Sequence, residues 1–190
     1  MTRSAALLIA IGLLPVPTTA YAEMQDDIAV KIKRDGETFA VAVELAVDAT
    51  PEQVFAVLTD YDNMAKFVSN VVESRIVRRD GERIVVEQRS RLAFGPLHFD
   101  FTNLRVVEPV PFSEIQSCVT EGDMQGSSFT TRLTAQGTRT FIDNRGSFHA
   151  DRWIPPIIGN VVLEGETRKQ FQEFKAEILR RKGGAARPDK

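Results

Sequence analysis

The last long segment with a regular apolar pattern covers residues 160–181. Its apolar residues recur at steps of three and four, which places them on one face of a helix, while charged residues occupy the other positions. That face contains Leu163, Thr167, Phe171, Phe174 and Ile178. Upstream, apolar positions alternate with polar ones instead. We therefore predict one long amphipathic helix whose apolar face covers an antiparallel sheet.

Period-2 alternation predicts a first strand at residues 39–47. A short helix follows, because Thr50 and Gln53 have the spacing of a capping box and Pro51 suits the first helical position. Asp62 or Asn63 is the candidate cap of a second short helix. Six further strands are then separated by turn signals such as Asp-Gly. They are predicted at residues 71–79, 83–94, 97–109, 112–119, 126–135 and 138–150.

These elements define an α+β fold, with an antiparallel sheet of about seven strands, two short helices after the first strand and a long C-terminal helix. With the stretch ATPEQVFAVLTDYDNMAKFVSNV at residues 49–71, this order resembles the START-like superfamily. Within it, the chain resembles the polyketide-cyclase and lipid-transport branch that includes the coenzyme-Q-binding START proteins. The resemblance implies a helix-grip fold, in which a curved sheet wraps the last helix around a deep apolar cavity for a sterol, lipid, quinone or polyketide.

Polar residues lie among the aromatic ones on the faces that are predicted to point inward, and each needs a partner or a ligand when buried. The pattern alone favours a filled core, since phenylalanine at alternating strand positions is ordinary packing; the resemblance favours a cavity instead. The candidate ligand-binding residues are Gln88, Ser90, Phe99, Phe101, Phe129, Thr131, Asn144, Phe148, Thr167, Phe171 and Phe174. Arg105 shares the parity of Phe99 and Phe101 and is the candidate for a basic residue pointing inward, unless a bulge near the strand end turns it out.

Residues 152–159 form an unusually apolar connection that contains two prolines. One interpretation is a cavity entrance or a membrane contact, as tryptophan with aliphatic residues can provide. The other is a loop packed onto the sheet edge. The residues concerned are Trp153, Ile154, Ile157 and Ile158.

The N-terminus has the three-part pattern of a secretory signal peptide: a basic residue, a short apolar run and the small residues Ala20 and Ala22. The alternative is a buried N-terminal helix. We predict a signal peptide at 1–22, one START-like domain at 23–182 and a disordered tail at 183–190. Export implies the periplasm if the source has two membranes. The single cysteine, Cys118, allows no intramolecular disulfide.

Other functional classes find little support in the sequence. A formal charge of −2 with interleaved acids and bases argues against nucleic-acid binding. His98 and His149 share the parity of the charged positions, and no zinc spacing, phosphate loop or nucleophile elbow is present. We therefore assign no catalytic residue, no metal and no cofactor.

The leading hypothesis is an exported, monomeric, non-enzymatic protein that carries or sequesters a hydrophobic small molecule or lipid, with transient membrane contact as an open question. A cyclase or dehydratase acting on an aromatic or polyketide-like substrate is the first alternative. The second is a protein-interaction module that uses the loop around Trp153.

Overall fold

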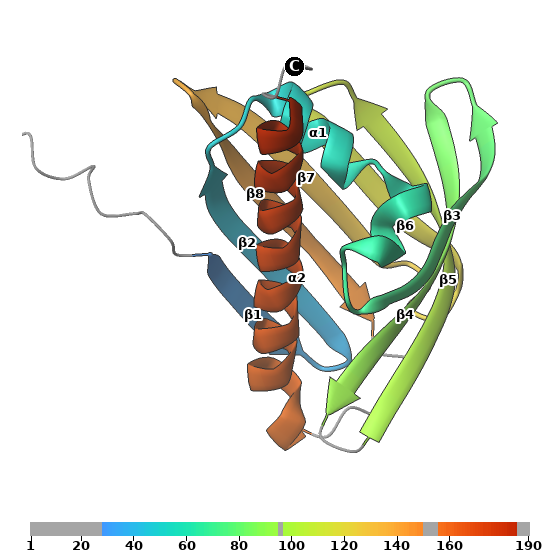
Figure 1. The fold of residues 1–190 in the computed structure, drawn as a ribbon. Helices are drawn as coiled ribbons and strands as arrows, with labels where there is room; N and C mark the ends of the chain where they lie inside the picture. Colours follow the sequence, from blue (N-terminus) through green and yellow to red (C-terminus); the bar gives the residue numbers. More distant parts are fainter. Residues whose placement is uncertain (1–27, 95–96, 150–155, 186–190) are drawn as a thin grey trace, which may run out of the picture.

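A single curved antiparallel sheet surrounds a long helix in this protein (Figure 1). The structure is a computed structural model and describes residues 28–94, 97–149 and 156–185. Over these residues the sheet has eight strands in the order β1-β2-β8-β7-β6-β5-β4-β3. The strands are β1 (Ala29–Asp35), β2 (Thr38–Val47), β3 (Val71–Asp80), β4 (Arg83–Phe94), β5 (Leu97–Val110), β6 (Glu114–Gly122), β7 (Ser128–Gln136) and β8 (Arg139–His149).

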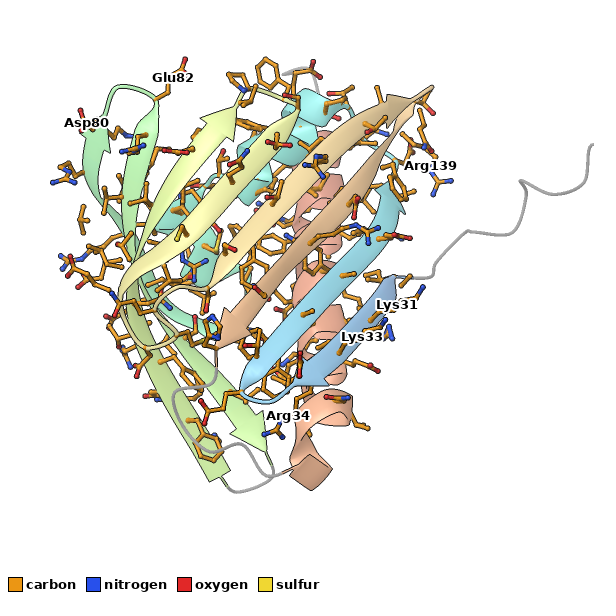
Figure 2. The ribbon with its side chains drawn as sticks, turned by 180° about the vertical axis from the view of Figure 1, so that it is seen from behind. Lys31, Lys33, Arg34, Asp80, Glu82 and Arg139 are labelled. Carbon is orange, nitrogen blue, oxygen red and sulfur yellow. The ribbon has the colours of Figure 1, made fainter. Side chains whose placement is uncertain are left out.

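The predicted strands are all present, and one further strand, β1, was not predicted. β1 has only two buried apolar residues, Val30 and Ile32, and its alternation is too short to be distinctive. Pairing with β2 and the hydrogen bond from Arg168 of α2 to the Ile28 carbonyl, 2.9 Å long, stabilise it. On this edge strand Lys31 and Lys33 are exposed (Figure 2), as is common where an open edge must not pair with another chain.

The helix α1 (Pro51–Leu58) has the predicted capping box. The backbone N–H of Gln53 donates to the Thr50 hydroxyl at 3.4 Å, and the Thr50 N–H donates to Gln53 Oε1 at 3.1 Å. The second short helix is a 3₁₀ helix, η1 (Tyr61–Lys66), so Asp62 lies within it and is not its cap. The Asp62 carboxylate instead accepts a hydrogen bond from the Ile76 N–H at 2.7 Å, which ties η1 to β3.

The helix α2 (Pro156–Ala185) lies across the concave face of the sheet (Figure 1). It begins earlier than predicted: Ile157 and Ile158 belong to its first turn and not to a loop, because proline is compatible with the first helical position. It ends at Ala185, so residues 183–185, which were assigned to the tail, belong to its last turn. Trp153 and Ile154 lie outside the described residues, as do the predicted signal peptide and residues 186–190.

The hydrophobic core combines buried residues of the sheet, of the short helices and of α2. Phe171, Phe174 and Ile178 of α2 are buried, as their spacing predicted. The rings of Phe171 and Phe174 have centroids 5.9 Å apart, and the ring of Phe67 meets Phe174 edge-on at 6.2 Å. Ile178 is fully buried, whereas the earlier positions Leu163 and Thr167 are only partly buried. The N-terminal half of the helix is therefore less tightly packed on the sheet than the C-terminal half.

Candidate functional site

A cavity of about 320 Å³ lies between the concave face of the sheet, η1 and α2. Its wall is mainly apolar and is completed by polar side chains from both layers. The lining residues are Val41, Leu58, Tyr61, Met64, Asn70, Gln88, Ser90, Arg91, Leu92, Phe101, Asn103, Arg105, Ile115, Ser117, Met124, Phe129, Thr131, Asn144, Phe148, Leu163, Glu166, Thr167, Gln170, Phe171 and Phe174.

Most of the candidate ligand-binding residues predicted from the sequence line this cavity. They come from four strands and from α2, and strand parity turns them toward a common space. The lining members of the predicted set are Gln88, Ser90, Phe101, Phe129, Thr131, Asn144, Phe148, Thr167, Phe171 and Phe174.

Phe99 is the predicted residue that does not line the cavity. It pairs with Leu92 near the turn of the β4–β5 hairpin, two residues beyond Phe101. Parity gives the face of a strand but not how far along the strand the cavity extends. The side chains of Ile157 and Ile158 are not among the described parts of α2.

Four polar side chains beneath η1 form what we call the inner polar group: Tyr61, Gln88, Asn103 and Arg105. Gln88 of β4 and Asn103 of β5 are cross-strand partners. The Gln88 amide donates to the sulfur of Met64 at 3.4 Å. The guanidinium of Arg105 donates from Nε and Nη2 to Asn103 Oδ1 at 3.4 and 3.3 Å.

Arg105 lies at a register shift between β5 and β6 yet still lines the cavity, so the irregularity does not turn it outward. Burial lowers the pKa of its guanidinium, and the neighbouring Tyr61 acts in the opposite direction. Burial raises the pKa of Tyr61 to about 12, an effect that the positive charge of Arg105 opposes. Because a guanidinium keeps its proton in proteins and the phenol of Tyr61 is protonated well above neutral pH, this part of the cavity offers one cation and one neutral O–H donor at pH 7.

A second polar pair lies on the other side of the cavity. Thr131 and Asn144 are cross-strand partners on β7 and β8, and the Asn144 amide donates to the Thr131 hydroxyl at 2.8 Å. In contrast, the buried Oδ1 of Asn70 has no hydrogen-bond partner within the described ranges. An acceptor of this kind in a cavity wall can be satisfied by a donor on a ligand or by water.

The cavity reaches solvent near Arg91, whose side chain retains 45% of its surface exposed. Arg91 forms a two-pronged ion pair with Asp100, with N–O distances of 2.6 and 2.9 Å. Glu166 and Gln170 of α2, both partly exposed, also line the cavity. The arginine near this opening is therefore already paired with a carboxylate.

Several lining residues were not among the predicted candidates. Asn103 shares the parity of Phe101 and Arg105, a signal that was available in the sequence. Tyr61 lies next to the candidate cap of the second short helix, and nothing in its local sequence indicates that the 3₁₀ helix directs it toward Arg105 of β5. Gln170 precedes Phe171 on the predicted helix and lies at the edge of the expected apolar face.

The described residues contain no group of three or more histidine, cysteine, aspartate or glutamate side chains placed to bind a metal. His98 and His149 are exposed, as their parity predicted, and Nδ1 of His149 lies 2.9 Å from the Thr38 hydroxyl. In this part of the chain no helix is both long and apolar enough to cross a membrane.

The fold and the cavity define a helix-grip protein, in which a curved sheet and a C-terminal helix enclose an internal space. The chain belongs to the polyketide cyclase / dehydrase and lipid transport family, whose model matches residues 38–179. The resemblance inferred from residues 49–71 is thereby confirmed at the level of the superfamily. No curated protein matches the sequence.

Solved structures share the fold at low sequence identity. The Zhui aromatase/cyclase from a Streptomyces species superposes with a TM-score of 0.66 at 17% identity, covering 78% of this chain and 98% of that protein. A START superfamily protein from Mycobacterium smegmatis superposes with a TM-score of 0.63 at 10% identity, covering 74% of this chain and 97% of that protein. A STAR-related lipid transfer protein from Xanthomonas axonopodis superposes with a TM-score of 0.57 at 10% identity, covering 81% of this chain and 99% of that protein.

Proposed function

We propose that this protein is an exported carrier that holds one hydrophobic small molecule, a lipid, quinone or polyketide-like compound, between its sheet and α2. The observation that carries the proposal is the cavity of about 320 Å³ with a mainly apolar wall. Small-molecule pockets have volumes of about 300–1,000 Å³ and combine apolar walls with a few polar groups. Apolar burial, at about 25 cal/mol per Å², drives binding, and the polar side chains Gln88, Ser90, Asn144 and Thr167 orient the ligand.

The cavity volume limits the size of the ligand that can be enclosed. It lies at the lower end of the range for small-molecule pockets. A single acyl chain or one fused ring system suits such a space better than a whole diacyl lipid. A longer ligand would extend past Arg91 into solvent.

Cellular location is a further part of the proposal. Residues 1–22 act as a secretory signal, which releases the domain into the periplasm if the source has two membranes. The exposed lysines of the edge strand β1 support a monomer, because they disfavour pairing of two sheets through that edge.

The test is to express the full chain with its natural export route, purify the processed protein without detergent and compare native with denaturing mass spectra. The expected result is a complex whose extra mass belongs to an apolar compound and is lost on denaturation. Cleavage after Ala22 is read from the same denaturing spectrum. A protein that purifies empty and also fails to bind added lipids and quinones would contradict the carrier function.

A second candidate function is that of a cyclase or dehydratase. It is favoured by Tyr61 and Arg105, two hydrogen-bond donors in the cavity that could stabilise an enolate or a carbonyl oxygen as charge develops. The two functions differ in their response to single polar substitutions. In an enzyme, Tyr61→Phe abolishes turnover while ligand binding persists, whereas a carrier retains its activity.

A further inference from the structure

Arg105 brings a positive charge into the cavity, and no carboxylate of the described residues forms an ion pair with it. Its hydrogen bonds go to the neutral amide of Asn103, and both are long. Among the described residues, Tyr61 is the single group with an electrostatic effect on it. A guanidinium has five N–H donors, so most of those on Arg105 have no acceptor in this part of the chain.

The other arginine of the cavity has a different environment. Arg91 is half-exposed, and Asp100 compensates its charge through two short hydrogen bonds. The lining set contains one carboxylate, Glu166 on α2, and it is not among the groups that act on Arg105. The uncompensated charge is therefore confined to the end of the cavity beneath η1.

A charge withdrawn from water without a partner destabilises a folded protein. A protein that retains such a group gains from it when a bound molecule supplies the opposite charge. Arginine is well suited to this task, because its planar fork matches the two oxygens of a carboxylate. The neighbouring Tyr61, which is protonated at neutral pH, adds an O–H donor at the same end.

The polar and apolar ends of the cavity follow one strand. Arg105, Asn103 and Phe101 have the same parity on β5, and all three line the cavity. Phe101 and Arg105 are four positions apart, which corresponds to about 13 Å at the rise of an extended strand. Leu92 and Phe101 line the apolar end, nearer the β4–β5 turn.

We infer that the preferred ligand is an amphipathic organic acid whose carboxylate pairs with Arg105 and whose apolar body extends along β5 toward Phe101. This inference rests on the proposed binding function and specifies its ligand class. It predicts discrimination between an acid and a neutral molecule of the same chain length.

The experiment is calorimetric titration of the exported, delipidated protein at neutral pH with decanoate and with decan-1-ol. We expect decanoate to bind at least about tenfold more tightly than decan-1-ol, a difference that one charge-assisted pair can supply. Arg105→Met should remove this preference and leave the affinity for decan-1-ol unchanged or higher. Because this variant replaces an unpaired charge with an apolar chain, its melting temperature without ligand should match or exceed that of the wild type.

Arg145→Gln provides the matched control, since Arg145 is exposed and pairs with Glu44 and Asp143 away from the cavity. It should retain the full preference for decanoate. Equal affinity of the wild type for both probes would overturn the acid preference and leave the carrier function standing. An equal loss of preference in Arg105→Met and Arg145→Gln would also overturn the acid preference, because the preference would then come from the surface charge of the protein and not from the cavity. Binding of neither probe would overturn the acid preference, while the carrier function is decided by the mass spectra described above.

Discussion

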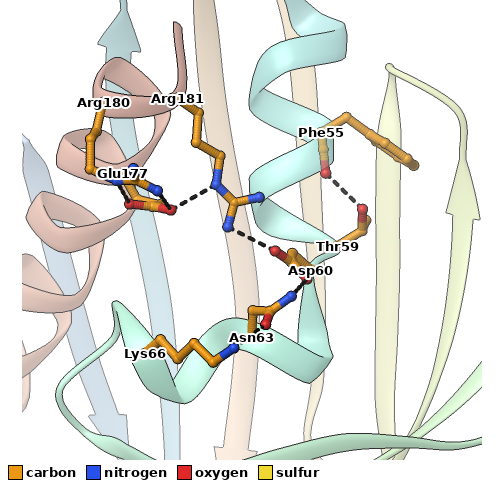
Figure 3. A network of polar contacts seen from close by, with 8 residues as sticks. All are labelled: Phe55, Thr59, Asp60, Asn63, Lys66, Glu177, Arg180 and Arg181. Carbon is orange, nitrogen blue, oxygen red and sulfur yellow. Dashed lines mark hydrogen bonds and ion pairs between the residues drawn. The ribbon is translucent and has the colours of Figure 1, made fainter. Parts of the chain in front are cut away.

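Arg181, near the end of α2, donates a hydrogen bond of 2.7 Å to the carboxylate of Asp60, which directly precedes η1 (Figure 3). The same guanidinium donates to Glu177 at 2.7 Å, and its carbon lies 5.3 Å from the centre of the Phe67 ring. Asp60 also accepts from the Asn63 amide at 2.8 Å. This network joins the C-terminal end of the long helix to the short helices that cover the cavity.

Substitution of Arg181 should loosen this junction. Arg181→Met leaves the carboxylate of Asp60, 21% exposed, without its ion-pair partner. We expect a loss of about 1–2 kcal/mol in the free energy of unfolding, between the values for exposed and buried pairs. Urea denaturation measures it. Arg75→Met, which breaks the exposed pair with Glu87, is the control and should change stability by less than about 0.5 kcal/mol. Equal effects of the two variants would contradict a special role for this junction.

The same network predicts a dependence of stability on pH. Hydrogen bonds from Arg180 and Arg181 lower the pKa of Glu177 to about 2 from an ordinary value of 4.5. Because the folded-state pKa is the lower one, the stabilisation is complete above pH 4.5 and is lost as the pH falls toward 2. The difference in unfolding free energy between wild type and Glu177→Gln should therefore be constant from pH 7 to 5 and shrink below 4.5. A constant difference down to pH 2.5 would contradict this origin.

Tyr61 permits a direct test of the inner polar group. In the chain that begins at Glu23, Tyr61 is the one tyrosine, so phenolate absorbance reports it alone. We expect the phenol to ionise at about pH 12 in the folded protein. The free energy of unfolding should fall as the pH rises from 10, because the folded state keeps the proton up to a higher pH than the unfolded state. Arg105→Met should raise the pKa of Tyr61 further, since the guanidinium favours the phenolate. An unchanged titration would show that the two groups do not interact.

Gly146 lies directly opposite Phe129 in the β7–β8 ladder. A methyl group there would overlap the Ser128 carbonyl oxygen and lie 2.5 Å from the Phe129 ring. Gly146→Ala should destabilise the protein by about 1–3 kcal/mol and, by displacing Phe129, weaken ligand binding. In α2, Gly165 has open space around it, and Gly165→Ala should add up to about 1 kcal/mol of stability with binding unchanged. Thermal melts and titrations of both variants check this contrast.

Filling the cavity should separate binding from folding. Ser90→Phe places a ring among the lining residues at the middle of the cavity, so we expect at least about tenfold weaker ligand binding at nearly unchanged stability. Thr134→Phe adds the same volume on the exposed side of β7 and should leave affinity unchanged. If Ser90→Phe bound ligand as tightly as wild type, the functional surface would have to lie elsewhere.

Much of the architecture could be predicted from local sequence signals. The capping box of Thr50 and Gln53, the buried face of α2 and the parity of strands β3 to β8 all depend on residues that are close in sequence. These signals also selected residues of which all but Phe99 line the cavity, because an inward parity is a local property of a strand. The strand β1 could not be recognised in the same way, since its stability comes from β2 and α2 and not from its own pattern.

The amino-acid sequence by itself therefore determined the elements other than β1, the faces they bury and the family. Only the tertiary structure decided that these faces enclose a cavity and not a filled core, because that depends on the curvature of the sheet and on how η1 and α2 are placed over it. It also placed Tyr61 beside Arg105, 44 positions later in the chain, and Phe99 beyond the cavity. Such juxtapositions result from long-range packing, for which no local pattern exists.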